Sequence, residues 1–256
     1  MKTEKRSLND CLVQVIDRRG MTPKKLGADW TTEGYPVLSA NNVKSTGLQK
    51  INDIRYVGEE TYQKWMKEEI QRGDILLTSE APAGEVYVWD SDKKIVVGQR
   101  LYALRVKKDV NPWFLAYYLR SSKGQAEIVN KCSGSTVFGI SAKMFDYIEV
   151  VLPEKSIQDK IATVLRNIEQ KIKTNTTLVQ RFESLARLVY DYWFVQFDFP
   201  DENGRPYKSS GGKMVWRNDL KREIPEGWGV RKLAEICNTK IGGTPSTEKK
   251  NIGMEI

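Results

Sequence analysis

Histidine is absent from the 256 residues of the sequence. This absence excludes Ser-His-Asp and Cys-His catalysis, zinc sites with histidine ligands, and histidine as a general acid or base. Cysteine is scarce: Cys11, Cys132 and Cys237 lie far apart, without the spacing of a metal site. Three isolated cysteines indicate reduced thiols, which are typical of a cytoplasmic protein.

Long apolar runs and two nucleotide-related motifs are also missing. No run approaches the ~18 residues of a membrane span, and the start MKTEKRSLND lacks the apolar core of a signal peptide. NPWF at 111–114 lacks the second proline of the Asn-Pro-Pro-Tyr motif of adenine methyltransferases, and no glycine-rich cofactor loop accompanies it. Gly242-Gly243-Thr244 is not followed by the Gly-Lys-Ser/Thr of a phosphate-binding loop. These absences argue against a membrane protein and against a self-contained methyltransferase or nuclease.

Positive charge is in excess, with a formal net charge of +8. The excess lies in residues 1–153 and 200–256 rather than in the segment between them, and no run of lysines produces it. This charge favours an anionic partner such as nucleic acid. It does not establish one, because many soluble proteins reach a similar charge without binding nucleic acid.

The segment 156–197 contains neither proline nor glycine, and its apolar residues recur at seven-residue spacing with a second set four residues later. The residues of this apolar seam are Ile161, Leu165, Ile168, Ile172, Val179, Phe182, Val189 and Trp193, with Asn175 at one seven-residue position. Such a pattern predicts a helix that packs along another helix, about 60 Å long at ~1.5 Å per residue. A polar residue in the seam weakens the pairing but fixes its register. An ordinary long core helix is the alternative.

Short strand-like segments separated by turns fill residues 1–153. The segments with β-branched and aromatic patterns are 35–44, 73–80, 84–89, 93–106 and 147–153. Two further segments, 59–72 and 111–129, favour helices. The sequence therefore predicts an α+β fold in which a strand-rich globular domain precedes the long helix.

Polar residues gather just beyond several of these strand-like segments, where loops on a rigid scaffold commonly carry recognition. Asn, Gln and Arg can contact purine edges, whereas Ser, Thr and Lys suit phosphates. The predicted DNA-facing set is Asn41, Asn42, Lys44, Ser79, Gln99, Arg100, Ser135, Thr136 and Lys143. For any single member, such as Asn41 or Asn42, a structural role in a turn is an equal alternative.

The residues after the helix fall into three parts. The aromatic-rich stretch DYWFVQFDFP is interpreted as an anchor that buries the helix end, with a docking surface for a protein as the alternative. Residues 200–227 are turn-rich and charged, so we expect a linker. KLAEICNTKIGGTPSTEKK is similar to SLNDCLVQVIDRRGMTPKK near the N-terminus, so 228–256 is expected to be the truncated start of a second copy of the first domain. Chance similarity of two turns is the alternative.

Together these segments resemble the specificity subunit of type I restriction–modification systems, over nearly the whole chain. The resemblance rests on YPVLSANNVK, GDILLTSEAPAGEVYVW, GQRLYALR, GSTVFGISAKMF, the helix with its IAxVLxxIxxKI start and YDYWFVQFDFP end, IPEGW and KIGGTPST. A full-length member has two target-recognition domains, each followed by a long helix. The two helices pair as an antiparallel coiled coil and dock two modification subunits, and each domain reads one half of a bipartite DNA site.

The resemblance implies four parts: a target-recognition domain (1–153), a spacer and dimerisation helix (154–199), a linker (200–227) and a truncated second recognition domain (228–256). A slip of reading frame in the lysine codons near residue 250 is one explanation for such an ending, which the nucleotide sequence would decide.

The function that the resemblance implies is non-catalytic and cytoplasmic, with no cofactor in this chain, because S-adenosylmethionine, ATP and magnesium belong to partner subunits. The implied partners are double-stranded DNA and the modification (methyltransferase) subunit; whether a restriction subunit joins them is left open. With one helix per chain, we expect an antiparallel homodimer that reads an inverted-repeat site. The alternative is a truncated remnant that binds the modification subunit without function or as an inhibitor.

Overall fold

The computed structural model describes residues 3–134, 138–240 and 242–243. The chain forms two compact units, Met1–Lys173 and Thr174–Ile256, which are described separately. The boundary between them falls within one long helix, α4 (Lys155–Tyr190). Among the described residues, no helix is both long and apolar enough to cross a membrane.

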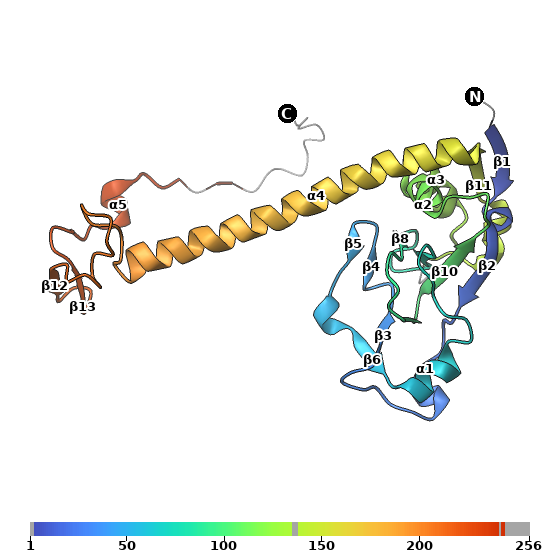
Figure 1. Ribbon diagram of the computed structural model, residues 1–256, viewed down its shortest axis with the longest axis horizontal. Helices are drawn as coiled ribbons and strands as arrows, with labels where there is room; N and C mark the ends of the chain where they lie inside the picture. Colours follow the sequence, from blue (N-terminus) through green and yellow to red (C-terminus); the bar gives the residue numbers. More distant parts are fainter. Residues whose placement is uncertain (1–2, 135–137, 241, 244–256) are drawn as a thin grey trace. The chain divides into compact units, whose positions relative to one another are not determined.

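An antiparallel four-stranded sheet lies at the centre of the first unit (Figure 1). Its strands, in spatial order, are β2 (Leu12–Asp17), β10 (Leu101–Val106), β7 (Ile75–Thr78) and β8 (Val86–Val88). A second, mixed sheet has the order β6 (Arg55–Val57), β3 (Tyr35–Leu38) and β9 (Val96–Val97). Two strand pairs complete the unit: β1 (Thr3–Ser7) with β11 (Glu149–Pro153), and β4 (Val43–Lys44) with β5 (Gly47–Leu48).

The two central strands of the four-stranded sheet are buried on both faces. Ile75 and Leu77 of β7 belong to one hydrophobic core, together with Tyr102 of β10, whereas Leu76 and Ala103 belong to a second core. Successive side chains of a strand point to opposite faces of its sheet. A strand with a core on each side therefore has a continuous apolar run, which is the pattern of ILLT in this sequence.

Two helix predictions are wrong in their extent. The helix predicted over 59–72 is the shorter α1 (Glu59–Trp65): Met66 leaves the helical conformation, with φ −102° and ψ 87°, and packs with Ile70 into the second core. The helix predicted over 111–129 is two helices, α2 (Pro112–Arg120) and α3 (Ser122–Asn130).

Ser121 separates α2 from α3. It ends α2 with an extended backbone, and its hydroxyl accepts a hydrogen bond from the N–H of Gly124, which caps α3. Gly124 is required at this junction because a Cβ there would lie 2.2 Å from the carbonyl oxygen of Tyr118.

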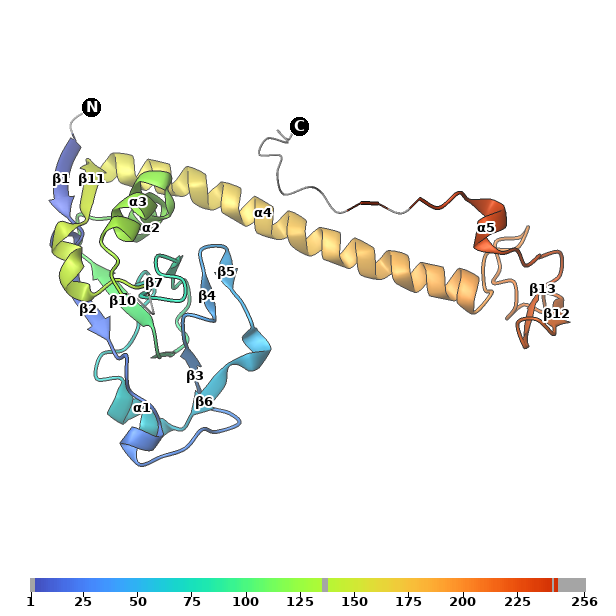
Figure 2. The same ribbon diagram turned by 180° about the vertical axis from the view of Figure 1, so that it is seen from behind.

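The first turns of α4 are attached to α2, which lies alongside them (Figures 1 and 2). The buried amide of Gln158 accepts a hydrogen bond from the backbone N–H of Asn111 at 2.9 Å. Three turns later, Glu169 accepts hydrogen bonds from the Tyr117 hydroxyl at 2.6 Å and from Arg120 at 3.0 Å. Polar contacts therefore fix the beginning of the long helix to the domain.

The long helix and the α+β class are confirmed. The apolar seam along α4 is largely exposed: Ile161 is 37% exposed, Ile168 50%, Val179 55% and Phe182 65%. Apolar side chains at this spacing normally pack against another helix. Their antiparallel pairing stays a prediction.

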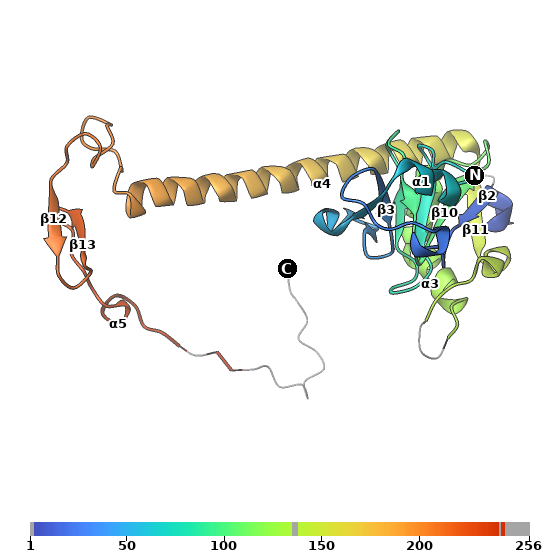
Figure 3. The ribbon, with the colours of Figure 1, turned by 90° about the horizontal axis from the view of Figure 1, so that it is seen from below.

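The second unit contains the end of α4, a π-helical turn (Asp191–Val195), a short helix α5 (Leu233–Ile236), and a hairpin of β12 (Met214–Arg217) and β13 (Arg222–Pro225), which Figure 3 shows side by side. The hairpin lies within the segment predicted as a linker.

Aromatic rings pack against Trp228 in this second unit. Phe197 meets it edge-on at 5.5 Å between ring centroids and Phe199 stacks on it at 5.4 Å. Phe197 is only 4% exposed, whereas Trp193 is 37% and Phe194 44% exposed. The aromatic-rich stretch thus includes both buried and exposed rings. The boundaries of the four predicted parts stay a prediction.

Candidate nucleic-acid interface

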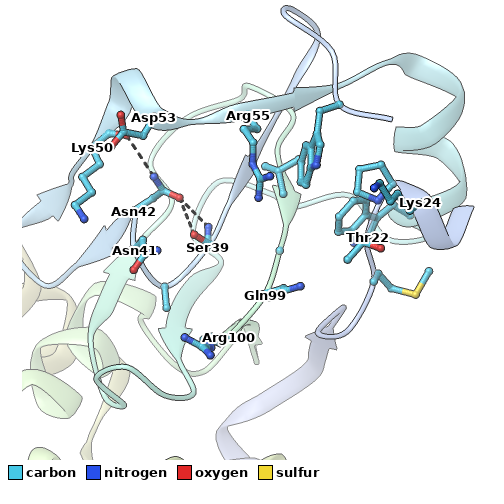
Figure 4. A pocket seen from close by; sticks show the side chains of 17 residues that line it. Thr22, Lys24, Ser39, Asn41, Asn42, Lys50, Asp53, Arg55, Gln99 and Arg100 are labelled. Carbon is cyan, nitrogen blue, oxygen red and sulfur yellow. Dashed lines mark hydrogen bonds between the residues drawn. The ribbon is translucent and has the colours of Figure 1, made fainter. Parts of the chain in front are cut away.

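A cleft of about 550 Å³ lies in the first unit (Figure 4). We call it the polar cleft. Its lining comes from residues 21–24, from the turn between β3 and β4, from residues 50–55, and from the turn between β9 and β10. The polar side chains that line it include Lys24, Asn41, Lys50, Arg55, Gln99 and Arg100. Three predicted DNA-facing residues, distant in sequence, are therefore exposed around one cavity: Asn41, Gln99 and Arg100.

Backbone contacts join the turn between β3 and β4 to the turn between β9 and β10. The N–H of Ala40 donates to the carbonyl of Gln99 at 3.3 Å, and the N–H of Gly98 donates to the carbonyl of Leu38 at 2.7 Å. A Cβ on Gly98 would lie 2.7 Å from that same carbonyl oxygen, so only glycine allows this approach. The close packing of these turns places Asn41 and Gln99 in the same cleft.

The lining of the polar cleft is rich in positive charge. Among the described residues that line it, four side chains are cationic and Asp53 is the one carboxylate. Arg100 pairs with Glu80 at 2.9 Å. Lys24 and Lys50 have no carboxylate partner within the described ranges of the chain. Unpaired cations around a cavity attract phosphate groups.

Asn42 also lines the cleft, but its side chain is hydrogen-bonded within its own turn. It is 5% exposed, and its carbonyl oxygen accepts hydrogen bonds from the N–H and the hydroxyl of Ser39 at 3.1 and 2.9 Å. Its amide nitrogen donates to the carbonyl of Gln49 at 3.4 Å (Figure 4 shows the Ser39 contacts). The side chain of Asn42 thus holds the turn that presents Asn41, and its contact with DNA stays a prediction.

Ser79 is also buried, at 1% exposure, and its contact with DNA stays a prediction. Its backbone joins two loops: its N–H donates to the carbonyl of Arg100 and its carbonyl accepts from Ile140. The bond to Arg100 helps to hold that residue at a φ of 62°, a region that non-glycine residues rarely occupy. Ser79 therefore supports the loop of Arg100.

The other predicted residues lie apart from the polar cleft or outside the described chain. Lys44 pairs with Glu85 at 3.6 Å. Burial raises the pKa of Glu85, but hydrogen bonds from Ser45 and the charge of Lys44 together lower it by more, so the net shift of this pKa is downward. Lys143 is exposed on a 3-10 segment and does not line the cleft. Ser135 and Thr136 lie outside the described residues.

Sequence reasoning missed Arg55, whose guanidinium lies 3.8 Å from the ring centroid of Trp30, another lining residue. No periodicity or motif in the sequence connects these two residues. The indole of Trp65 also lines the cleft, and its N–H has no acceptor within the described part of the chain. Buried donors without an acceptor are uncommon in folded proteins. Among the described residues, no cluster of three or more His, Cys, Asp or Glu side chains is suited to a metal ion.

Comparison with known proteins defines the class first. The family described as the type I restriction modification DNA specificity domain matches residues 2–183. The chain therefore belongs to the type I restriction–modification specificity-subunit family.

Individual relatives agree with this assignment. The type I restriction enzyme MjaIX specificity subunit of Methanocaldococcus jannaschii is 30% identical over 172 residues, which are 67% of this chain and 37% of the relative. The HindI specificity subunit of Haemophilus influenzae is 27% identical over 137 residues, which are 52% of this chain and 30% of the relative. This chain thus matches between 30% and 37% of the length of these curated relatives.

A solved structure confirms the fold. The type I restriction–modification S subunit from M. genitalium superposes with a TM-score of 0.53 at 20% identity, over 77% of this chain and 46% of that one. A chain from a structural study of complex assembly and conformational transition in the type I restriction–modification system superposes with a TM-score of 0.52 at 19% identity, over 73% of this chain and 43% of that one.

Proposed function

We propose that this chain is a non-catalytic DNA-specificity subunit that reads one half of a bipartite DNA site. The observation that carries the proposal is the polar cleft, in which exposed Asn, Gln and Arg side chains converge beside unpaired lysines. Asn, Gln and Arg can discriminate bases, whereas lysines attract the phosphate backbone. The family membership supports DNA as the ligand.

The proposed assembly is a homodimer through α4. The exposed seam supports it, because apolar side chains sustained at seven-residue spacing are stable only when another helix covers them. Antiparallel pairing about a two-fold axis would place one recognition domain at each end of the paired helices. A dimer of this kind would read an inverted repeat whose unread spacer is set by the helix length.

The dimer is proposed to dock on modification subunits in the cytoplasm. These partners would supply methyl transfer with S-adenosylmethionine, and any ATP- and magnesium-dependent step would likewise belong to partner subunits. This chain would contribute the choice of DNA site.

The test is co-expression of the chain with its modification subunit, followed by mapping of methylated positions across the host genome. A new bipartite inverted-repeat motif is the expected result. An asymmetric motif would contradict the homodimer, because it requires a second specificity chain. A stable complex without new methylation would favour the non-functional or inhibitory remnant instead.

The dimer can be tested separately with Ile168→Asp. Burial of an isoleucine side chain contributes ~1.5–3 kcal/mol, and the symmetric dimer buries two copies, so we expect the dimer Kd to rise at least about 100-fold. Thr163→Asp introduces the same charge at an exposed position of α4 outside the seam and is the matched control. Sedimentation equilibrium measures both variants. Equal dissociation constants for them would refute pairing through the seam.

A further inference from the structure

Arg55 differs from the other arginines of the first unit. Residues 1–173 contain nine arginines, and eight have a carboxylate oxygen at 3.0 Å or less. Within the described part of the chain, Arg55 is the one without a carboxylate partner, although it is exposed and lines the polar cleft. An arginine that folding does not use for an ion pair is available to a ligand.

The guanidinium of Arg55 is held in place by an aromatic ring instead. It lies 3.8 Å from the ring centroid of Trp30. Trp30 is itself anchored, because it packs on the second core and the N–H of the next residue, Thr31, donates to the carbonyl of Tyr56 at 3.0 Å. Stacking orients the planar guanidinium without using its N–H donors.

The surroundings of Arg55 favour a nucleobase over a phosphate as its ligand. Figure 4 shows Arg55 extending from β6 into the cleft, with Gln99 across from it. A planar fork held at a fixed orientation matches the two acceptors on the major-groove edge of guanine. Within the described residues, Lys24 and Lys50 of the same cleft have no such orienting contact, and they suit phosphates, which accept from many directions.

We propose that Arg55 reads a guanine in the half-site and that Trp30 is its positioning residue. This assignment rests on the proposed function, since it names one base contact of the same interface. Arg55 donates two hydrogen bonds to O6 and N7 of the guanine, and Trp30 holds the fork in the plane of the base.

The test compares the wild-type complex with Arg55→Lys in methylation and binding of oligonucleotides in which each half-site base pair is changed in turn. Lysine keeps the charge but loses the fork. We expect Arg55→Lys to reduce the discrimination at one G·C pair by about 5- to 150-fold, which corresponds to ~1–3 kcal/mol for one bidentate base contact. Discrimination at the other base pairs should change less. Arg72→Lys is the matched control, because Arg72 pairs with Asp90 and Asp92 and does not line the cleft.

Variants of Trp30 separate positioning from simple folding. Trp30→Leu is expected to relax the same G·C pair as Arg55→Lys, and Trp30→Phe, which restores an aromatic face, is expected to recover most of the discrimination. A thermal melt of each variant identifies loss of fold. Relaxation at every base pair alike by Trp30→Leu would overturn the positioning role.

The possible failures are distinguishable. Unchanged discrimination in Arg55→Lys overturns the base contact while the proposed function stands. The base contact is also overturned if Arg55→Ala weakens binding to all DNA sequences alike and reduces the slope of log affinity against log salt concentration by about 1, because that result identifies a phosphate contact. If the wild-type complex itself has no sequence preference, the proposed function fails, and the guanine assignment fails with it.

Discussion

Gln158 joins the start of the long helix to the rest of the first unit, and its replacement should measure how much this link contributes to stability. Its side chain is 2% exposed on the first turn of α4. The oxygen accepts from the N–H of Asn111 at 2.9 Å, and the nitrogen donates to the carbonyls of Pro153 at 2.8 Å and Asp109 at 3.3 Å. One amide thus links the end of β11, the turn before α2 and the start of α4.

Gln158→Met keeps the length of the side chain and removes all three hydrogen bonds. A buried polar group left without a partner costs ~1–3 kcal/mol. The bond at 3.3 Å is the weakest of the three, so we expect the free energy of unfolding to fall by about 2–4 kcal/mol in total. In a unit of this size each kcal/mol lowers Tm by ~2–4 °C, so the expected decrease is about 5–15 °C.

The assay is differential scanning calorimetry of the intact chain, read on the transition of the first unit. Asn167→Met makes a similar polar-to-apolar change at an exposed position of the same helix and should shift Tm by under about 2 °C. A decrease for Gln158→Met no larger than that of the control would refute the idea that this amide holds the helix to the domain.

Two further predictions concern titratable groups. Burial raises the pKa of Cys11 to about 11, whereas Cys237 is exposed. A thiol reagent at pH 8 should therefore modify Cys237 and leave Cys11 unmodified until the protein is denatured. Mass spectrometry of the native protein tests this, and rapid native labelling of Cys11 would contradict it. The pKa of Glu85 lies below its ordinary 4.5, so its ionised form stabilises the fold above that pH and this contribution is lost as the pH falls through the lowered pKa. The difference in Tm between wild type and Glu85→Gln should therefore be larger at pH 7 than at pH 3, and an equal difference at both would contradict the ion pair with Lys44.

The elements of this fold could be predicted where local pattern and tertiary packing agree. Between 156 and 197, the absence of proline and glycine and the seven-residue spacing of apolar residues predict a helix, and α4 forms there. The pattern misled where packing dominates. Met66 and Ile70 lie at helical spacing, yet α1 ends before them, and both side chains are buried in the second core from a non-helical stretch.

The candidate site was predictable only in part, for a similar reason. Asn41 and Gln99 follow strands, so a search for polar turns finds them. The same search also selected Asn42, because it cannot distinguish an amide that faces solvent from one that closes its own turn. Arg55 escaped it because its partner Trp30 is distant in sequence, and the pairing of Thr31 with Tyr56 brings the two side by side.

Under the proposed DNA-reading function, the difference between exposed Asn41 and turn-closing Asn42 bears on how the DNA preference could be changed. Asn42 and the close approach at Gly98 fix the backbone of the two turns, so a change at either position would move the side chains that these turns contribute to the polar cleft. Asn41 and Gln99 are exposed on that fixed backbone, so changing them alters a contact without altering the turn. Because side chains on rigid turns can be exchanged singly, we expect substitutions at Asn41 or Gln99 to change individual base preferences, whereas substitution of Asn42 should weaken binding to all sequences alike.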